Sequence, residues 1–194
     1  MKVIGLTGGM GMGKSTAAAA FRRARVPVFD ADASVHHLQA RGGRAVPVIE
    51  AAFPGTTIEG AVDRAALRQA VLGKPEALAR LEAILHPMVR REEKAFLARA
   101  RRAGNRVAVL DIPLLFETGG RKVDRVIVVS APRAVQMHRV RLRRKMSAAD
   151  IEAVLARQMP DAEKRHRADI VVRTGLSRFH ALRALRRLIK ELRA

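Results

Sequence analysis

The sequence contains no cysteine, tryptophan or tyrosine, and six phenylalanines supply its aromatic content of 3%. Without cysteine the chain can form neither disulfides nor thiolate metal sites, and it has no cysteine nucleophile. Scarce aromatic rings argue against a binder of single-stranded nucleic acid, because such proteins stack bases on them. No apolar run approaches the roughly 18 residues of a membrane span, and the short apolar N-terminus does not fit a signal peptide. We therefore expect a cytoplasmic protein.

Size and charge narrow the class of protein further. The 194 residues, 48% of them hydrophobic and 29% charged, are typical of one soluble globular domain, with or without insertions. There are 38 Lys and Arg residues against 18 Asp and Glu, which gives a net charge of +20. Residues 101–194 carry 23 basic and 9 acidic residues, against 15 and 9 in residues 1–100. This excess predicts anionic partners such as phosphates, nucleic acid or an acidic membrane surface.

Five short apolar runs alternate with helical sequence along the chain. They are Lys2–Thr7, Val26–Phe29, Val107–Leu110, Val126–Val129 and Ile170–Val172. Uniformly apolar strands separated by helices indicate an α/β fold, with a parallel sheet that is covered on both faces. More than 70 residues separate the second run from the third, which is too long for a simple crossover helix and predicts a helical insertion.

Several helices can be expected in the remaining sequence. In the first insertion they run from Arg64 to about Leu72 and from Pro75 to about Arg102, the second being interrupted and kinked at His86-Pro87. A second insertion follows the fourth apolar run, with helix starts at Ser130-Ala-Pro132 and at a capping box over residues 147–150. A last helix starts near Ser177. Its expected apolar face comprises Phe179, Leu182, Leu185, Ile189 and Leu192.

The strongest motif is the segment Gly8–Ser15, which fits G-x-x-x-x-G-K-[ST] between a predicted strand and a predicted helix. Such a loop wraps phosphates with its backbone N–H groups at a helix N-terminus. Lys14 would reach the β- and γ-phosphates, Ser15 would bind Mg²⁺ and Thr16 would reach the α-phosphate. The alternative is a glycine-rich turn that binds no nucleotide. The guanine motif N-K-x-D is absent, because Asn105 is the sole asparagine.

Acidic residues follow two of the predicted strands. Asp111 ends the third strand, where a phosphoryl-transfer enzyme holds its metal ion, and Asp30 and Asp32 follow the second. In a parallel sheet these strand ends share the edge at which ligands bind. Aspartate at a strand end is also common as a simple helix cap, which is the alternative for Asp30 and Asp32.

The sequence resembles the dephospho-CoA kinase family from residue 4 to about residue 175. The matching stretches, in the order and spacing of that family, are Ile4–Thr16, Asp30–Asp32, His86-Pro87, Asp111–Glu117, Arg157-Gln158, Lys164 and Ala168-Asp169. The resemblance implies transfer of the ATP γ-phosphate to the ribose 3′-hydroxyl of dephospho-CoA, the last step of coenzyme A biosynthesis. It also implies a P-loop NTPase-type three-layer fold with a five-stranded parallel sheet. The core would comprise residues 1–30, 104–131 and 168–194, with a helical acceptor-binding insertion at 31–103 and a helical lid at 132–167.

The resemblance also implies roles for single residues. Asp32 would be the general base on the 3′-hydroxyl, and Arg139 and Arg143, one turn apart on a lid helix, would neutralise the transferring group together with Lys14. Ser15 and Asp111 would bind Mg²⁺. The ATP phosphates would be held by Gly9, Gly11, Met12, Gly13, Lys14, Ser15 and Thr16. The acceptor pocket would be lined or supported by Asp32, His86, Pro113, Leu114 and Glu117. For the two arginines a solvated helix face is the alternative, and for His86-Pro87 a purely structural kink.

The chain departs from the family pattern at two places, and three alternative functions remain. Arg144-Lys145 makes the lid tip unusually basic, and Arg173-Thr174-Gly175 stands where many members have an asparagine that can meet the adenine edge. A kinase of nucleoside monophosphates is the neighbouring class. The net charge also motivates a nucleic-acid-dependent ATP switch or a membrane-surface role for the last helix. We expect small-molecule partners, ATP and dephospho-CoA, rather than a specific nucleic acid or a membrane.

Overall fold

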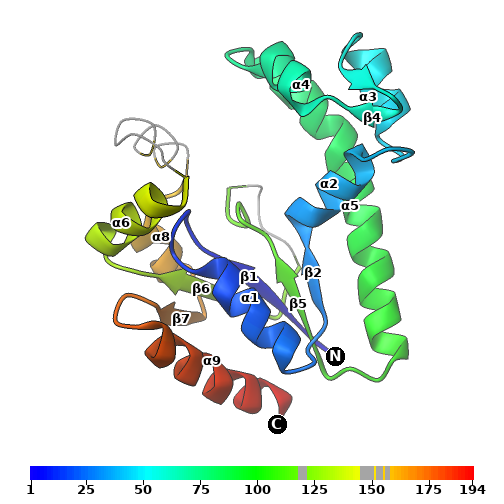
Figure 1. Cartoon of the computed structure of the whole chain (residues 1–194). Helices are drawn as coiled ribbons and strands as arrows, with labels where there is room; N and C mark the ends of the chain where they lie inside the picture. Colours follow the sequence, from blue (N-terminus) through cyan, green and yellow to red (C-terminus); the bar gives the residue numbers. More distant parts are fainter. Residues whose placement is uncertain (118–121, 145–150, 152–154, 156–157) are drawn as a thin grey trace. The chain divides into compact units, whose positions relative to one another are not determined.

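The computed structural model describes residues 1–117, 122–144, 151, 155 and 158–194 (Figure 1). Two compact units make up the chain: residues 1–29 with 99–194, and residues 30–98. The first unit is built on a parallel sheet, and the second is mostly helical. The capping box expected at residues 147–150 lies outside the described residues.

The sheet of the first unit has five strands in the order β2-β5-β1-β6-β7. Their bounds are Lys2–Thr7 for β1, Val28–Asp30 for β2, Val107–Asp111 for β5, Arg125–Ser130 for β6 and Ile170–Arg173 for β7. β1 pairs in parallel with both β5 and β6, and β6 pairs in parallel with β7. The expected α/β class with a five-stranded parallel sheet is therefore confirmed. The second strand was predicted at Val26–Phe29, but in the structure β2 begins at Val28 and ends at Asp30.

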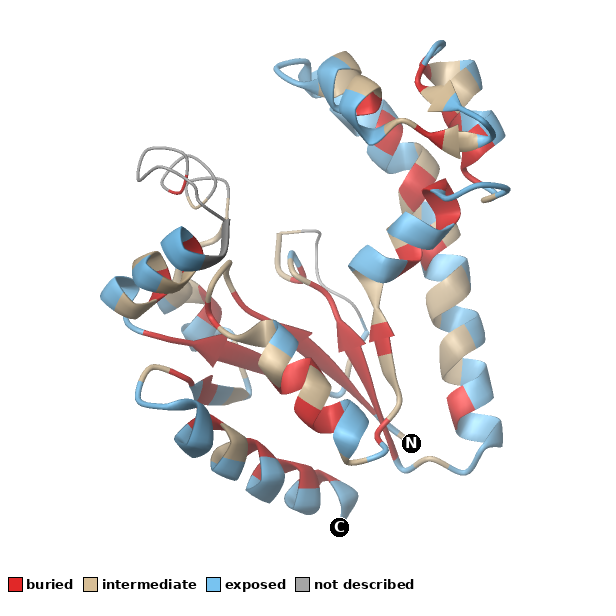
Figure 2. Ribbon diagram, in the orientation of Figure 1, coloured by how far each residue is buried: buried red, intermediate tan, exposed pale blue. Residues whose placement is uncertain are grey.

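Helices α1 (Lys14–Arg23) and α9 (Arg178–Arg193) cover one face of this sheet (Figure 1). Ile4 and Leu6 of β1 point to that face and pack with Phe21 of α1 and Leu185 of α9, all fully or almost fully buried. Figure 2 shows the central strands as an almost continuously buried layer. The apolar runs of the sequence therefore mark the core correctly.

The opposite face of the sheet is recognised from strand alternation, because successive side chains of a strand point to opposite sides. Thr7 of β1 donates to the carbonyl of Pro113 (2.9 Å), and Ser130 of β6 donates to Asp161 (2.7 Å). Asp161 opens the short helix α8 (Asp161–His166). The segment after β5 and α8 thus lie on this second face. Helix α6 (Arg133–Arg144) follows β6 in the chain.

One expectation for the last helix is wrong. Phe179 is 73% exposed, whereas the buried residues of α9 are Ala181, Leu185, Leu188, Ile189 and Leu192. At about 100° per residue, Phe179 lies roughly 135° around the helix from the middle of that buried face. Position on the helical wheel, and not hydrophobicity, therefore leaves this ring in solvent.

The second unit contains helices and one small hairpin. Its helices are α2 (Ala31–Gln39), α3 (Val46–Ala52), α4 (Arg64–Val71) and most of α5 (Pro75–Arg102), and its strands are β3 (Thr57–Ile58) and β4 (Ala61–Val62). The sequence did not predict the hairpin. Its turn residues Glu59 and Gly60 both have positive φ (50° and 78°), which is the geometry of a tight two-residue turn. Strands of two residues are too short to show alternation.

Helix α5 continues through His86-Pro87, so the predicted interruption is wrong. Proline removes one backbone hydrogen bond, but the other turns of this 28-residue helix remain hydrogen-bonded around it. Leu81, Leu85 and Val89 are buried on one face at helical spacing, which anchors the turns on either side of Pro87.

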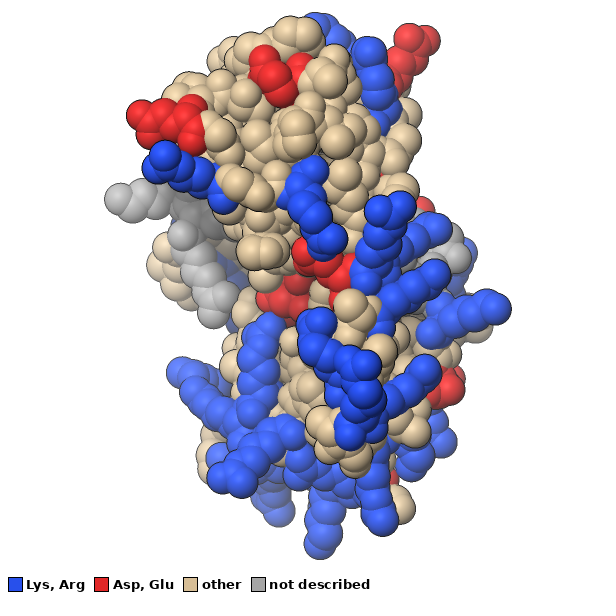
Figure 3. Space-filling model, turned by 90° about the vertical axis from the view of Figure 1, so that its right-hand side faces the viewer, with Lys and Arg blue, Asp and Glu red and all other residues tan. Residues whose placement is uncertain are grey.

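Basic side chains dominate the molecular face in Figure 3, where Lys and Arg project from much of the lower surface. On α9 the exposed basic residues include Arg183, Arg186, Arg187 and Lys190. Among the described helices, none combines the length and hydropathy of a membrane span. These exposed charges attract anions at long range. They are in contact with water and need no specific binding partner.

Two substitutions in α9 test the placement of this helix. Leu185→Ala should lower the free energy of unfolding by about 2–5 kcal/mol, because it empties a fully buried site. Phe179→Ala should change it by no more than about 0.5 kcal/mol, because the ring is in solvent. Urea unfolding followed by far-ultraviolet circular dichroism suits a chain without Trp or Tyr. A large loss for Phe179→Ala would mean that α9 is rotated relative to the structure.

Candidate active site

The loop between β1 and α1 contains glycines at positions where another residue would clash or be strained. Gly8 has φ 155°, and a Cβ at this position would lie 2.5 Å from Val129 of β6. Gly13 has φ 97° and is the N-cap of α1, a conformation that L-residues rarely adopt. The loop can therefore lie directly against β6 and still turn sharply into α1.

The first N–H groups of α1 have no hydrogen-bond partner among the described residues. Gly13 provides no side-chain cap, and its carbonyl accepts from the N–H groups of Thr16 and Ala17. The N–H groups of Gly13, Lys14 and Ser15 make no hydrogen bond with any described residue. Free N–H groups at the positive end of a helix form an anion site. The loop is thus suited to bind the phosphates that its motif predicts.

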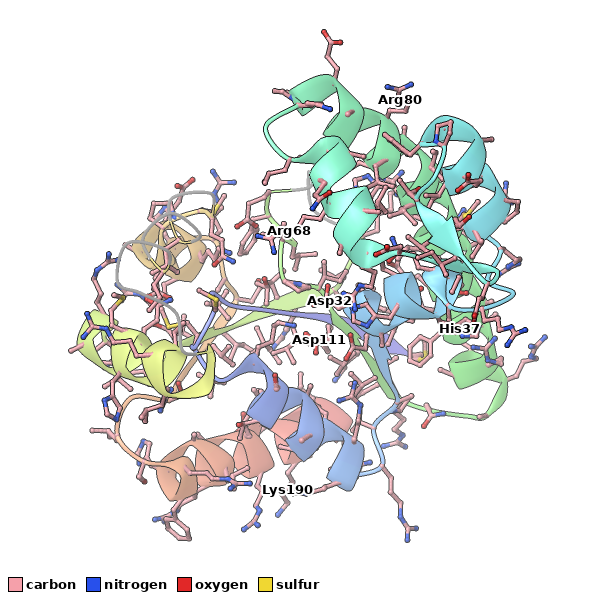
Figure 4. The ribbon with its side chains drawn as sticks, turned by 45° about the horizontal axis from the view of Figure 1, so that its top comes forward. Asp32, His37, Arg68, Arg80, Asp111 and Lys190 are labelled. Atoms are coloured by element: carbon pink, nitrogen blue, oxygen red, sulfur yellow. The ribbon has the colours of Figure 1, made fainter. Side chains whose placement is uncertain are left out.

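Lys14, the first residue of α1, forms an ion pair with Asp111 at the end of β5. The Lys14 Nζ atom lies 2.6 Å from Asp111 Oδ1, and the two side chains are 18% and 4% exposed. The register of the sheet places Asp111 of β5 beside Leu6 of β1, at the carboxyl end from which the loop departs. Figure 4 labels Asp111 at this strand end. The sequence predicted both residues for the site, and the structure brings them together.

The segment after β5 is held from both ends. Pro113 accepts through its carbonyl from Thr7 (2.9 Å), while Leu114 is 40% exposed. At the far end, Glu117 Oε1 lies 2.7 Å from Lys164 Nζ and accepts from the N–H of Met159 (3.0 Å). Lys164 is 1% exposed. Glu117 thus ties this segment to the region around α8, a contact that the sequence did not predict.

The ion pair with Lys164 changes the titration of Glu117. Burial by itself raises the pKa of this carboxyl, but the Lys164 ammonium and backbone N–H donors, including Met159, outweigh it. The pKa of Glu117 therefore lies below its usual value of 4.5. Glu117 is consequently ionised at neutral pH and compensates the buried ammonium.

Arg139 of α6 contacts the phosphate-binding loop and Thr174, the residue that follows β7. Its guanidinium donates to the carbonyl (2.6 Å) and hydroxyl (3.1 Å) of Thr174, and to the carbonyl of Gly11 at 3.5 Å. Arg139 is therefore not part of a solvated helix face. Arg143 belongs to the same helix, one turn further on.

A cavity of about 870 Å³ lies beside the loop within the first unit. Gly9 and Met12 border it on the loop side. Its other walls come from the start of α6, from Leu155 and residues 158–162, 164 and 165, and from the turn between β7 and α9, where Gly175 and Leu176 lie. This volume and position suit the base and ribose of a nucleotide whose phosphates rest on the loop.

Asp30, Asp32 and His86 belong to the second unit. Asp30 is the N-cap of α2 and accepts from the N–H of Ala33 (3.0 Å), so the capping alternative applies to this residue. Asp32 is exposed in the first turn of α2 (Figure 4). His86 is half-buried on α5. The carboxylate of Asp32 is thus free of a capping role in the structure.

The sequence did not predict that two buried residues, Gln136 and Thr174, contact the loop. Gln136 of α6 donates to the carbonyl of Met10 (2.7 Å), and Thr174 donates to the carbonyl of Met12 (2.6 Å). Neither residue lies in a motif, and both are far from residues 8–15 in the sequence. Thr174 was noted as a departure from the family pattern, but only in connection with the adenine base.

The pair of Glu117 and Lys164 predicts a pH-dependent stability. Because the folded pKa of Glu117 is lowered, its stabilisation is complete above pH 4.5 and is lost as pH falls through the folded pKa. Glu117→Gln should lower the free energy of unfolding at pH 7 by about 3–5 kcal/mol, since it leaves a buried ammonium unpaired.

This variant should also lose less stability than wild type between pH 5 and strongly acidic pH, as measured by urea unfolding. Glu163→Gln is the matched control, because the pair of Glu163 and Arg167 is 43% and 49% exposed. Its effect should stay within about 1 kcal/mol. Equal losses in the two variants at pH 7 would contradict a special role for the buried pair.

Comparisons with known proteins agree on one family. The dephospho-CoA kinase family matches residues 2–177. A dephospho-CoA kinase of Gluconobacter oxydans is 56% identical over 198 aligned positions, covering 100% of this chain and 98% of its own. The enzyme of that name from Mesorhizobium japonicum is 54% identical, covering 100% and 98%.

Solved structures have the same fold. A crystal structure from Thermus thermophilus superimposes with a TM-score of 0.86 at 37% identity, covering 100% of this chain and 98% of that one. Dephospho-CoA kinase from Campylobacter jejuni gives a TM-score of 0.68 at 23% identity, covering 99% and 97%, and shikimate kinase from Acinetobacter baumannii gives 0.53 at 13%, covering 99% and 93%. The last two show the likeness of fold alone. With a family match over residues 2–177 and relatives more than half identical, the chain belongs to the dephospho-CoA kinase family.

Proposed function

We propose that this chain transfers the γ-phosphate of ATP to the ribose 3′-hydroxyl of dephospho-CoA, the last step of coenzyme A biosynthesis. The observation that carries the proposal is the phosphate-binding loop with its free N–H groups, placed beside Lys14 and Asp111 in a chain of this family. The curated relatives from Gluconobacter oxydans and Mesorhizobium japonicum bear the name of this enzyme. A cytoplasmic location stays a prediction.

ATP would bind across the loop and the adjoining cavity. The segment from Gly9 to Thr16 would hold its phosphates, chiefly through the N–H groups of Gly11, Gly13, Lys14 and Ser15, which make no hydrogen bond with a described residue. The base and ribose would occupy the cavity of about 870 Å³, which is bordered by Gly9 and Met12. The cavity and loop lie in one unit, so this part of the site needs no contribution from the other.

Lys14 would leave Asp111 when the polyphosphate binds. The ammonium at 2.6 Å from Asp111 is compensated by that carboxylate, and a phosphate oxygen offers it an equivalent partner. Lys14 would then neutralise charge on the β- and γ-phosphates, which grows on the leaving group during transfer. A second cation could then take the place that Lys14 had held at Asp111 Oδ1.

The residues at this point fit Mg²⁺. The carboxylate of Asp111 and the hydroxyl of Ser15 are hard oxygen donors, which Mg²⁺ prefers, and the described residues contain no cluster of three metal-ligating side chains. Mg²⁺ commonly binds one or two protein oxygens together with substrate phosphates. Ser15 and Asp111 would hold the ion, which supplies charge neutralisation at the β- and γ-phosphates when bound.

Asp32 would accept the proton of the acceptor hydroxyl. It lies in the first turn of α2, two residues beyond the end of β2, and parallel sheets bind ligands at the carboxyl ends of their strands. Removing the proton makes the 3′-oxygen a better nucleophile toward the γ-phosphorus. His86, Pro113, Leu114 and Glu117 would line or support the acceptor pocket. The exposed Leu114 offers an apolar contact, and Glu117 would fix the segment that carries it.

Arg139 and Arg143 would neutralise charge on the transferring group from the lid. Arg139 is the better supported of the two, because its guanidinium reaches the carbonyl of Gly11 in the loop. When phosphates bind, the same guanidinium could donate to them from nearly the same position.

Activity with different acceptors tests the proposed function. Coupled measurement of ADP release should show turnover with Mg-ATP and dephospho-CoA and at least about a hundredfold lower kcat/KM with adenosine or cytidine monophosphate. Such discrimination is expected because a site built for polar groups of its substrate rejects analogues that lack them. Equal kcat/KM with a monophosphate would assign the chain to the nucleoside monophosphate kinases. Turnover that requires nucleic acid would favour the ATP-switch alternative.

The role of Asp32 is tested by Asp32→Asn. This variant should lower kcat by about 10²–10⁴-fold while the Kd for ATP stays within about twofold, because it removes the base and leaves the phosphate site unchanged. Asp63→Asn is the matched control in the same unit. Asp63 caps α4 through Ala65 and Ala66, and asparagine can accept the same hydrogen bonds. Wild-type kcat in Asp32→Asn would remove Asp32 as the base.

A further inference from the structure

Thr174 is buried where the phosphate-binding loop meets β6 and α6. It is 6% exposed and follows β7, and its N–H donates to the carbonyl of Ser130 (2.8 Å). Its hydroxyl lies 2.6 Å from the carbonyl oxygen of Met12 and 3.3 Å from that of Ser130. A hydroxyl has one proton to donate, and the shorter distance assigns it to Met12.

The acceptor side of the same hydroxyl is also occupied. Arg139 donates to it at 3.1 Å and to the carbonyl of Thr174 at 2.6 Å. The guanidinium has only donors, so it fixes the hydroxyl as acceptor toward α6 and as donor toward Met12. A Cβ on Gly13 would lie 3.4 Å from this hydroxyl, which shows how closely the two segments pack.

Gln136 makes the corresponding contact two residues earlier in the loop. It is 4% exposed, and its side-chain amide donates to the carbonyl of Met10 at 2.7 Å. Two buried side chains from outside the loop therefore hold alternate carbonyl groups, those of Met10 and Met12. Both come from the part of the chain that follows β6.

The orientation of these carbonyls determines the orientation of the next N–H groups. All peptide bonds of the described chain are trans, so each carbonyl points opposite to the N–H of the following residue. Holding the carbonyls of Met10 and Met12 toward Gln136 and Thr174 turns the N–H groups of Gly11 and Gly13 the other way. Neither N–H makes a hydrogen bond with a described residue.

We propose that Gln136 and Thr174 are positioning residues that orient two peptide planes of the loop, so that the N–H groups of Gly11 and Gly13 face the β-phosphate of the nucleotide. The inference rests on the proposed ATP-binding function and adds to it the two side chains that pre-organise the loop. Residues 11 and 13 are both glycines, and glycine imposes little conformational preference on the backbone. The orientation of these peptide planes must therefore be fixed by contacts from outside the loop.

The decisive variant is Thr174→Val, which keeps the shape of the side chain and removes the hydroxyl. Loss of one orienting hydrogen bond should raise the inhibition constant of ADP against ATP about tenfold. The inhibition constant of AMP, which lacks the β-phosphate, should change by less than about twofold, and so should the KM for dephospho-CoA. Thr174→Ser should restore the ADP value to within about threefold of wild type.

Two further variants complete the test. Thr56→Val removes a buried hydroxyl that donates to the carbonyl of Phe53 (2.7 Å) in the other unit, and it should leave both inhibition constants unchanged. Gln136→Met removes the donor to Met10 while keeping the length of the side chain. Gln136 also borders the cavity assigned to the base and ribose, so the measured quantity is the ratio of the ADP to the AMP inhibition constant. This ratio should rise, as in Thr174→Val, and it provides the measurement if Thr174→Val does not fold.

The outcomes separate the inference from the proposed function. Selective weakening of ADP in Thr174→Val or Gln136→Met supports the positioning role. Equal weakening of ADP and AMP, or wild-type constants in a folded variant, would overturn it. Absence of turnover with dephospho-CoA in the wild-type protein would instead refute the proposed function, whatever the variants show.

Discussion

The backbone N–H groups that a loop offers to a phosphate cannot also hold the loop in place. In this chain the loop is fixed by its other surfaces: close packing of Gly8 against Val129, and hydrogen bonds that the carbonyls of Met10 and Met12 accept. The sheet, α6 and the turn after β7 all contribute to that support. Much of the first unit can thus be understood as the frame of one anion site.

Charge in this protein has two separate roles. At the site, cations are paired with specific partners, as in the contacts of Lys14 with Asp111 and of Lys164 with Glu117, where burial makes each interaction strong. On the surface, arginines cover exposed helix faces such as that of α9 and act through their long-range field. The net charge of +20 is therefore mostly a surface property, and only a few basic residues are assigned to phosphate binding.

Patterns within short stretches of sequence predicted the strands and helix starts that depend on interactions between nearby residues. The apolar runs identified the five strands because a strand that is buried on both faces must be apolar throughout. Helical spacing of apolar residues predicted the start of α9 near Ser177, and in the structure the Ser177 hydroxyl caps this helix by accepting from the N–H of His180. The hairpin of β3 and β4 was missed because its strands show no period, and Phe179 was misplaced because spacing alone does not define the centre of a buried face.

The sequence by itself determined the glycine-rich loop motif, the family and the position of Asp111 at the end of its strand, because each follows from a contiguous motif or from a strand end. The direct pairing of Lys14 with Asp111 came from the structure. Only the tertiary structure decided which residues support that loop. Gln136 and Thr174 lie more than 120 residues along the chain from it, and they act through backbone carbonyls. Every residue has a backbone carbonyl, so accepting a hydrogen bond through it requires no particular side chain. These two contacts therefore leave no motif in the sequence, and only folding brings the partners together.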